Sequence, residues 1–299
     1  MNFTRTTLLV LRLSCLTLFV ASAFGAEQVN RKLDAAPDGM VTIENTAGSI
    51  DVRGWSRNEV EVSAELGEDV EELVFERNGN SIVIRVESRR NNSRRTSSDL
   101  EVRVPQNSSV NISGVSTDVE VRAVRGALRL NSVSGDIASD AFEADIDVET
   151  VSGDVKVAGQ GMEATSRFST VSGDIDAEGL AGRMDINSVS GDMAITGGLF
   201  ERVDAHTTSG DIDYRAGLVG NGRMDVETIN GDLELMFAGE LSASFDIETF
   251  NGDIRNCFGP EPQRTSRYTP GRELKFTEGG GASRVTIRTL NGDLRLCRE

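Results

Sequence analysis

The sequence has few of the residues on which many catalytic and metal sites depend. His206 is the only histidine among 299 residues, and only three cysteines occur. A nucleophile–histidine pair or a His/Cys zinc cluster needs such residues close together. The sequence therefore predicts no catalytic site of these classes, no metal centre and no cofactor.

Aromatic residues are also scarce, at 5% of the chain, with one Trp and two Tyr. A globular core takes much of its buried area from aromatic side chains. A narrow core of stacked Val, Ile, Leu and Met does not need them. This scarcity favours an elongated architecture.

Long apolar runs are missing apart from Leu8 to Val20, which polar residues interrupt. A weakly basic start precedes this run, and Ala21-Ser22-Ala23 offers a small-residue cleavage site. The run is too short and too interrupted for a good membrane span. We predict a signal peptide over residues 1–25 and an exported, soluble mature protein without a transmembrane segment. Whether it resides in the periplasm, on the cell surface or outside the cell stays open.

Basic residues are outnumbered, since 31 Lys and Arg face 48 Asp and Glu for a net charge of −17. This balance argues against nucleic acid and anionic membranes as bulk partners. A net negative charge is typical of a soluble protein whose copies repel one another, or of a protein that binds a cationic partner. One basic cluster stands out, which either binds phosphate or an acidic glycan or is a solvated loop. It consists of Arg89, Arg90, Arg94 and Arg95.

What the sequence does have is a repeat: Ser-Gly-Asp, or Asn-Gly-Asp, occurs eight times. Successive Asp residues are 18 to 21 positions apart, with a last spacing of 40. This period is typical of a β-solenoid, whose coils bury their apolar faces only by stacking. We predict an all-β, single-stranded β-solenoid with about 18–21 residues per coil. The turn-forming residues are Gly135, Asp136, Gly153, Asp154, Gly173, Asp174, Gly191, Asp192, Gly210, Asp211, Gly231, Asp232, Gly252, Asp253, Gly292 and Asp293.

Each repeat is a strand, a turn and a strand. Ile146 and Val148 alternate with acids before one turn, and Val155 and Val157 follow it. Such alternation predicts half-buried strands on both sides of a bend. In several repeats the apolar set also includes the residue two positions before the Gly, as at Val151, Val189, Ile229, Phe250 and Leu290.

The domain boundaries follow from the repeat. Residues 26–110 are expected to form an irregular β-rich section that caps the first coil, with a hairpin at Asn78-Gly79. Residues 111–299 form the regular coils, with an insertion loop at 258–282. That loop carries Arg264, Arg267, Arg272 and Lys275 and serves either in recognition or as a lid over the last coil.

Two cysteines remain after signal removal, Cys257 and Cys297, each four residues after the Asp of its repeat. Equivalent positions in stacked coils lie about 4.8 Å apart, within reach of a disulfide. A metal site is the weaker alternative, because no histidine is near. We predict a disulfide, which an exported protein would form.

The repeated Asp residues have two interpretations. Stacked carboxylates can bind calcium, but calcium-binding β-rolls supply several ligands in each shorter repeat. The favoured alternative is that each Asp accepts hydrogen bonds from turn amides. His206 occupies a position where other repeats carry Glu or Asn, so it is expected to be a solvated surface residue.

The order of these features is similar to that of a known family. An export signal precedes a Gly-x-Ile-x-Val strand at Gly48–Val52 and Gly54-Trp55, and a strand ending at Pro105 leads into serial Val-Ser-Gly-Asp-Ile repeats. The chain resembles the bacterial putative-adhesin family over nearly all of its mature length. The resemblance implies a right-handed β-helix, a cell-envelope location and an adhesion or scaffolding role. It supplies no catalytic residues.

Together these observations predict a non-enzymatic, adhesin-like envelope protein that binds an envelope protein or a glycan through a rigid acidic surface. One alternative is an envelope stress or signalling accessory that binds a protein partner. The other is a polysaccharide-acting β-helix enzyme, since acid pairs are abundant.

Overall fold

The computed structural model describes residues 27–88 and 97–299, all of whose regular elements are strands. The predicted signal peptide and the Arg89, Arg90, Arg94 and Arg95 cluster lie outside these residues. No helix in the described part is long and apolar enough to cross a membrane. The strands are β1 (Glu27–Asp34), β2 (Met40–Trp55), β3 (Glu59–Leu66), β4 (Val70–Asn78), β5 (Ser81–Ser88), β6 (Ser98–Pro105), β7 (Ser109–Arg122), β8 (Leu128–Ser134), β9 (Ile137–Asp140), β10 (Ile146–Ser152), β11 (Val155–Ala158), β12 (Glu163–Ser172), β13 (Ile175–Glu178), β14 (Ala181–Ser190), β15 (Met193–Ser209), β16 (Ile212–Asn230), β17 (Leu233–Phe237), β18 (Ala243–Asn251), β19 (Ile254–Asn256), β20 (Gln263–Arg264), β21 (Arg272–Glu278), β22 (Ser283–Asn291) and β23 (Leu294–Arg298).

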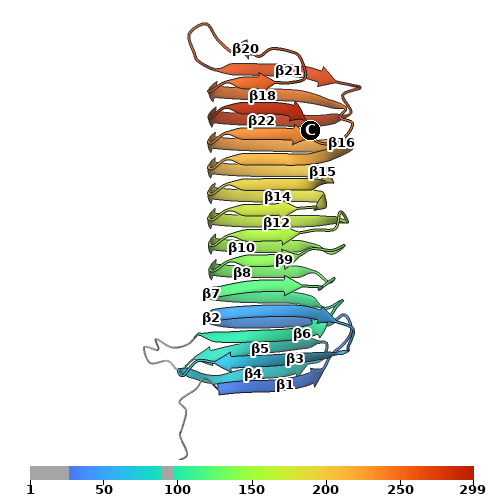
Figure 1. The fold of residues 1–299 in the computed structure, drawn as a ribbon, viewed down its shortest axis with the longest axis vertical. Helices are drawn as coiled ribbons and strands as arrows, with labels where there is room; N and C mark the ends of the chain where they lie inside the picture. The colour runs from blue at the N-terminus through green and yellow to red at the C-terminus, as the bar shows by residue number, and fades with distance from the viewer. Residues whose placement is uncertain (1–26, 89–96) are drawn as a thin grey trace, which may run out of the picture.

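The strands stack into a solenoid-like rod (Figure 1). In each repeat one strand precedes the Gly-Asp turn and one follows it, so the sheet has two layers that meet at the turns. β8, β10, β12 and β14 pair in parallel in the first layer, and β9, β11 and β13 pair in the second. Val148 lies between Leu130 and Phe168, so equivalent residues of successive repeats are neighbours.

The core runs along the rod between the two layers. Ile146 and Val148 point inward before the turn and Val155 and Val157 after it, all with 2% exposure or less. Each of these side chains packs on its counterparts in the coils on either side. The interior is thus filled by apolar rows, as the alternation predicts.

One apolar position in most coils faces away from the core, although the sequence pattern places it in the same apolar set as the core residues. Val189, grouped with the inward residues Met184 and Ile186, is 49% exposed. Ile186 points inward, so the alternation puts Asn187 outward, Ser188 inward and Val189 outward. Val151, Ile229, Phe250 and Leu290 are exposed for the same reason.

The N-terminal section continues the stack and then closes it. β2 pairs in parallel with β7 along most of its length, with Ile50 beside Val119. On its other side β2 pairs with β5 and β6, to which β4 and β3 add as antiparallel strands. The predicted hairpin is confirmed, because β4 and β5 pair up to Asn78 and Ser81. β1 lies antiparallel on β3 at this end.

The C-terminal coils do not stack in sequence order. β22 lies between β16 and β18 (Figure 1). In the other layer β23 lies between β17 and β19. The segment 258–282, expected to be a loop, contains β20 and β21. β21 pairs antiparallel with β18 along the edge that faces the end of the rod, and so covers that edge. The last coil of the chain, which contains β22, pairs with the opposite edge of β18.

Candidate functional site: the turn edge

The turn glycines allow the coils to approach one another closely. Gly135 has a φ of 142°, which L side chains rarely adopt. At Gly153 a Cβ atom would meet the carbonyl oxygen of Gly135 at 2.1 Å, and the later turns repeat this contact. Any side chain here would push neighbouring coils apart, so Gly is required by packing as well as by conformation.

The Asp residues of the turns form a continuous hydrogen-bonded row, the Asp ladder. The amide of Asp154 donates to Oδ1 of Asp136 at 2.9 Å, and the amide of Asp174 donates to Oδ1 of Asp154 at 3.0 Å. The same bond recurs at each step, with N–O distances of 2.7–3.0 Å. In stacking order the Asp ladder is Asp118, Asp136, Asp154, Asp174, Asp192, Asp211, Asp232, Asp293 and Asp253.

These bonds bear out the favoured interpretation of the Asp residues, with one refinement. The amide bound by each carboxylate belongs to the neighbouring coil, so the bond locks coils together. In the described chain no group of three or more His, Cys, Asp or Glu is placed to hold a metal ion.

A row of buried hydroxyl side chains lies inside the turn edge. Thr150 is 5% exposed, and Thr249 Oγ1 donates to the carbonyl of Gly292 at 3.3 Å. The row faces the interior and offers nothing to a ligand. The signal for it is a Ser or Thr four residues before each Asp. Its members are Ser132, Thr150, Thr170, Ser188, Thr207, Thr228, Thr289 and Thr249.

The outward apolar residues form a second row on the surface, the apolar ladder. Its members are 46–49% exposed and lie one above the other, because the residues flanking them pair between coils. Thr208 is the one polar member, between Val189 and Ile229. In stacking order the apolar members are Val115, Val133, Val151, Val171, Val189, Ile229, Leu290 and Phe250.

His206 lies on the same outer face, paired with Asn187 on one side and Glu227 on the other. Its Nδ1 lies 3.8 Å from a carboxylate oxygen of Glu227, and its side chain is 42% exposed. Its place in an outward polar row agrees with the prediction.

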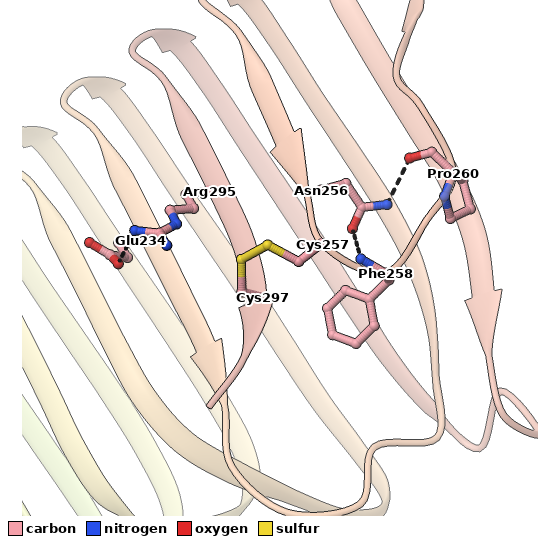
Figure 2. The surroundings of a disulfide bond; sticks show 7 residues. All are labelled: Glu234, Asn256, Cys257, Phe258, Pro260, Arg295 and Cys297. Carbon is pink, nitrogen blue, oxygen red and sulfur yellow. Dashed lines mark hydrogen bonds and ion pairs between the residues drawn. A yellow bond between two sulfur atoms is a disulfide. The ribbon is translucent and has the colours of Figure 1, made fainter.

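The predicted disulfide is present between Cys257 and Cys297, whose Cα atoms are 4.8 Å apart (Figure 2). The amide of Cys257 donates to the carbonyl of Leu296 at 2.9 Å. Asn256 orders the chain beyond the bond by donating to the carbonyl of Pro260 and accepting from the amide of Phe258 (Figure 2). The disulfide fastens β23 to the segment that follows β19.

Two cations of the 258–282 segment hold it onto the rod. Arg272 forms an ion pair of 2.6 Å with Asp253, and Lys275 lies 3.7 Å from Asp246. The ring of Phe276 stacks on Phe245 with centroids 4.5 Å apart. These contacts favour the lid interpretation of the segment over a free recognition loop.

Comparisons with known proteins give one family and several distant structures. The family model described as Toastrack DUF4097 matches residues 41–296. No curated protein matches the chain. A putative adhesin from Parabacteroides merdae aligns over 91% of this chain and 96% of its own, at 9% identity and a TM-score of 0.44. A putative lipid binding protein from Parabacteroides distasonis covers 91% and 96% at 11% identity and a TM-score of 0.43. A putative adhesin from Bacteroides fragilis covers 90% and 97% at 12% identity and a TM-score of 0.39.

Proposed function

Because the chain belongs to the Toastrack DUF4097 family, we propose that it is a non-enzymatic, adhesin-like binding or scaffold protein of the cell envelope. The observation that carries the proposal is the unbroken stack of coils, whose outward side chains recur in straight rows. Such a surface suits the binding of an extended or repeating partner more than the enclosure of a small substrate.

Rigidity supports this role. The Asp ladder and the close Gly contacts lock each coil to the next along the turn edge. A surface that is already ordered loses little conformational entropy when a partner binds. The rod can therefore present its rows without first having to fold around a ligand.

We propose in addition that the rod is a right-handed, single-stranded coil with about 18–21 residues per turn. Pairs such as Val148 with Leu130 and with Phe168 support that coil length. A crystal structure would test the handedness, and a left-handed coil would refute it.

We propose that the protein acts after export. The Cys257–Cys297 disulfide supports this, since such bonds persist in oxidising compartments. Cell fractionation combined with protease treatment of intact cells tests the location. Digestion on intact cells would favour adhesion at the surface. Protection until the outer barrier is opened would favour a scaffold or signalling partner within the envelope, and recovery from the cytoplasm would contradict export.

Binding is tested separately with the purified mature protein. We expect saturable binding to envelope fractions of the source bacterium, and a glycan array distinguishes a glycan from a protein partner. Absence of binding to both would contradict the proposed function. Release of reducing sugar from acidic polysaccharides above background would show catalysis and contradict it as well.

A further inference from the structure

The apolar ladder is the largest regular feature of the surface that the fold itself does not explain. Eight of its nine levels carry Val, Ile, Leu or Phe, although each side chain is about half exposed. The outward position two residues earlier in the same strands behaves differently. It carries Ser113, Asn131, Glu149, Ser169, Asn187, His206, Glu227, Arg288 and Glu248. Two adjacent outward rows of the same strands thus differ in polarity along the whole stack.

Strand geometry does not account for this difference. Both rows stand on parallel strands with the same register, so both are equally able to hold β-branched or polar side chains. A continuous exposed apolar strip on a soluble protein marks an interaction surface. With a rise of about 4.8 Å per coil, the ladder extends for about 38 Å.

The charges beside the apolar ladder indicate the chemistry of its partner. The Asp ladder follows three residues later, around the same turn, and its members are exposed except for the half-buried Asp154. On the other side the polar row carries three Glu, of which Glu149 lies 3.9 Å from Arg129 and Glu248 forms an ion pair of 2.6 Å with Arg288. The apolar strip is therefore bordered by negative charge mainly on the side of the Asp ladder.

This border disfavours two kinds of partner. A second copy docked ladder to ladder with its rod antiparallel would bring the two Asp ladders together, and an anionic membrane would meet the same repulsion. A partner with an apolar strip that has cationic side chains along one side would match both the apolar surface and the Asp ladder.

The spacing of the coils favours a helix as that partner. A helix parallel to the rod presents apolar residues once per turn of about 5.4 Å, close to the rise of about 4.8 Å per coil. Because the helical pitch and the coil rise differ little, helix residues stay within half a coil spacing of the ladder residues over about four helical turns. An extended strand repeats each face only every 6.6 to 6.8 Å or so, which fits less well.

We propose that the apolar ladder docks an amphipathic helical segment of a partner protein, with Lys or Arg on the side of its apolar face that meets the Asp ladder. This inference rests on the proposed binding function and identifies the surface and partner class that serve it. Apolar contacts along Val115 to Phe250 supply affinity, and the Asp ladder supplies orientation and a salt-sensitive association rate.

The test uses the mature protein and a fluorescent Leu/Lys amphipathic peptide of about 18 residues, with a Leu/Glu peptide of the same pattern as control. The ladder variant carries Val133→Thr, Val171→Thr and Val189→Thr. The matched control carries Asn131→Thr, Ser169→Thr and Asn187→Thr in the same three coils. Neither variant alters the net charge, so non-specific attraction of the cationic peptide is the same in both.

We expect the wild type to bind the Leu/Lys peptide, more weakly at higher salt, and not the Leu/Glu peptide. The ladder variant should weaken binding by about tenfold or more, and the control by less than about twofold. Thermal unfolding of both variants checks that the fold is intact. Binding that is unchanged in the ladder variant, equal for both peptides, or absent from the wild type would overturn the proposal.

Two further measurements identify other occupants. Light scattering that shows a dimer in the wild type and a monomer in the ladder variant would assign the ladder to a second copy. Ladder-dependent binding to zwitterionic vesicles would assign it to lipid. Either result overturns the helix proposal. The ladder variant is also tested on envelope fractions. If it loses peptide binding but still binds these fractions like the wild type, the proposed function stands and only this inference fails.

Discussion

At the scale of single residues, the close contacts between neighbouring coils leave no space for a side chain at the turn glycines. The Gly of a turn such as Gly153 packs against the carbonyl oxygen of the Gly in the preceding coil, and the Asp beside it accepts a hydrogen bond from the amide of the following coil. The sequence pattern predicts that Gly and Asp form the turn. It does not predict that both act between coils, because that depends on which turns are neighbours.

Replacing a turn glycine should destabilise the rod. Gly153→Ala places a Cβ 2.1 Å from the Gly135 carbonyl oxygen, at a φ of 156°. We expect a loss of more than about 2 kcal/mol of unfolding free energy in urea titrations. Gly220→Ala is the control, because nothing lies within 4 Å of its Cβ. Equal stability of the two variants would show that the turns are looser than described.

The buried Tyr214 should make stability fall at high pH. Burial raises the pKa of its phenol, whose hydroxyl donates to the Gly217 carbonyl at 3.1 Å. The unfolded chain releases this proton near pH 10, while the folded chain retains it, so unfolding free energy falls above about pH 10. Tyr214→Phe should cost about 1 kcal/mol at neutral pH but remove this part of the alkaline loss. Parallel pH profiles for the two proteins would contradict the argument.

At the scale of the strand, the alternation of side chains between the two faces decides which apolar residues form the core. Ile186 and Val189 lie in the same strand, three residues apart, so one faces inward and the other outward. Both are apolar, and the pattern alone groups them together. The structure separates them because two residues an odd number of positions apart in a regular strand point to opposite faces.

A pair of substitutions tests this assignment. Ile186→Asp should bury an unpaired charge among the core rows and prevent cooperative folding. Val189→Asp, at 49% exposure, should keep the fold and change the melting temperature little. Circular dichroism melting of both variants is the measurement. Unfolding by Val189→Asp, or a native melt for Ile186→Asp, would reverse the proposed faces.

At the scale of the whole molecule, both ends of the rod finish in antiparallel strands. β4 and β1 close one end and β21 covers the other, which limits the parallel edges that could recruit further chains. Near the second end the intercalated coil of β22 and β23 is tied to both neighbours. Arg295 pairs with Glu234 at 3.1 Å, and the disulfide joins Cys297 to Cys257.

Removing the disulfide should loosen this end first. Cys257→Ser with Cys297→Ser opens a 40-residue separation, so we expect a loss of about 3–4 kcal/mol of stability. Each coil contacts mainly its neighbours, so hydrogen exchange should rise in β18 to β23 before β8 to β14. A uniform rise along the rod, or no change in stability, would contradict this expectation.

The sequence by itself determined the coil period, the Gly-Asp turns and the cysteine pair, because each depends on local chemistry repeated at a constant interval. Only the tertiary structure decided that the coil of Asp293 lies between those of Asp232 and Asp253. All coils share the same inward pattern, so the pattern cannot rank possible neighbours. That order follows from β21, which occupies the outer edge of β18 and leaves the inner edge to β22. The exposed apolar ladder likewise emerged only when the register placed Val115 to Phe250 in one line on the outer face.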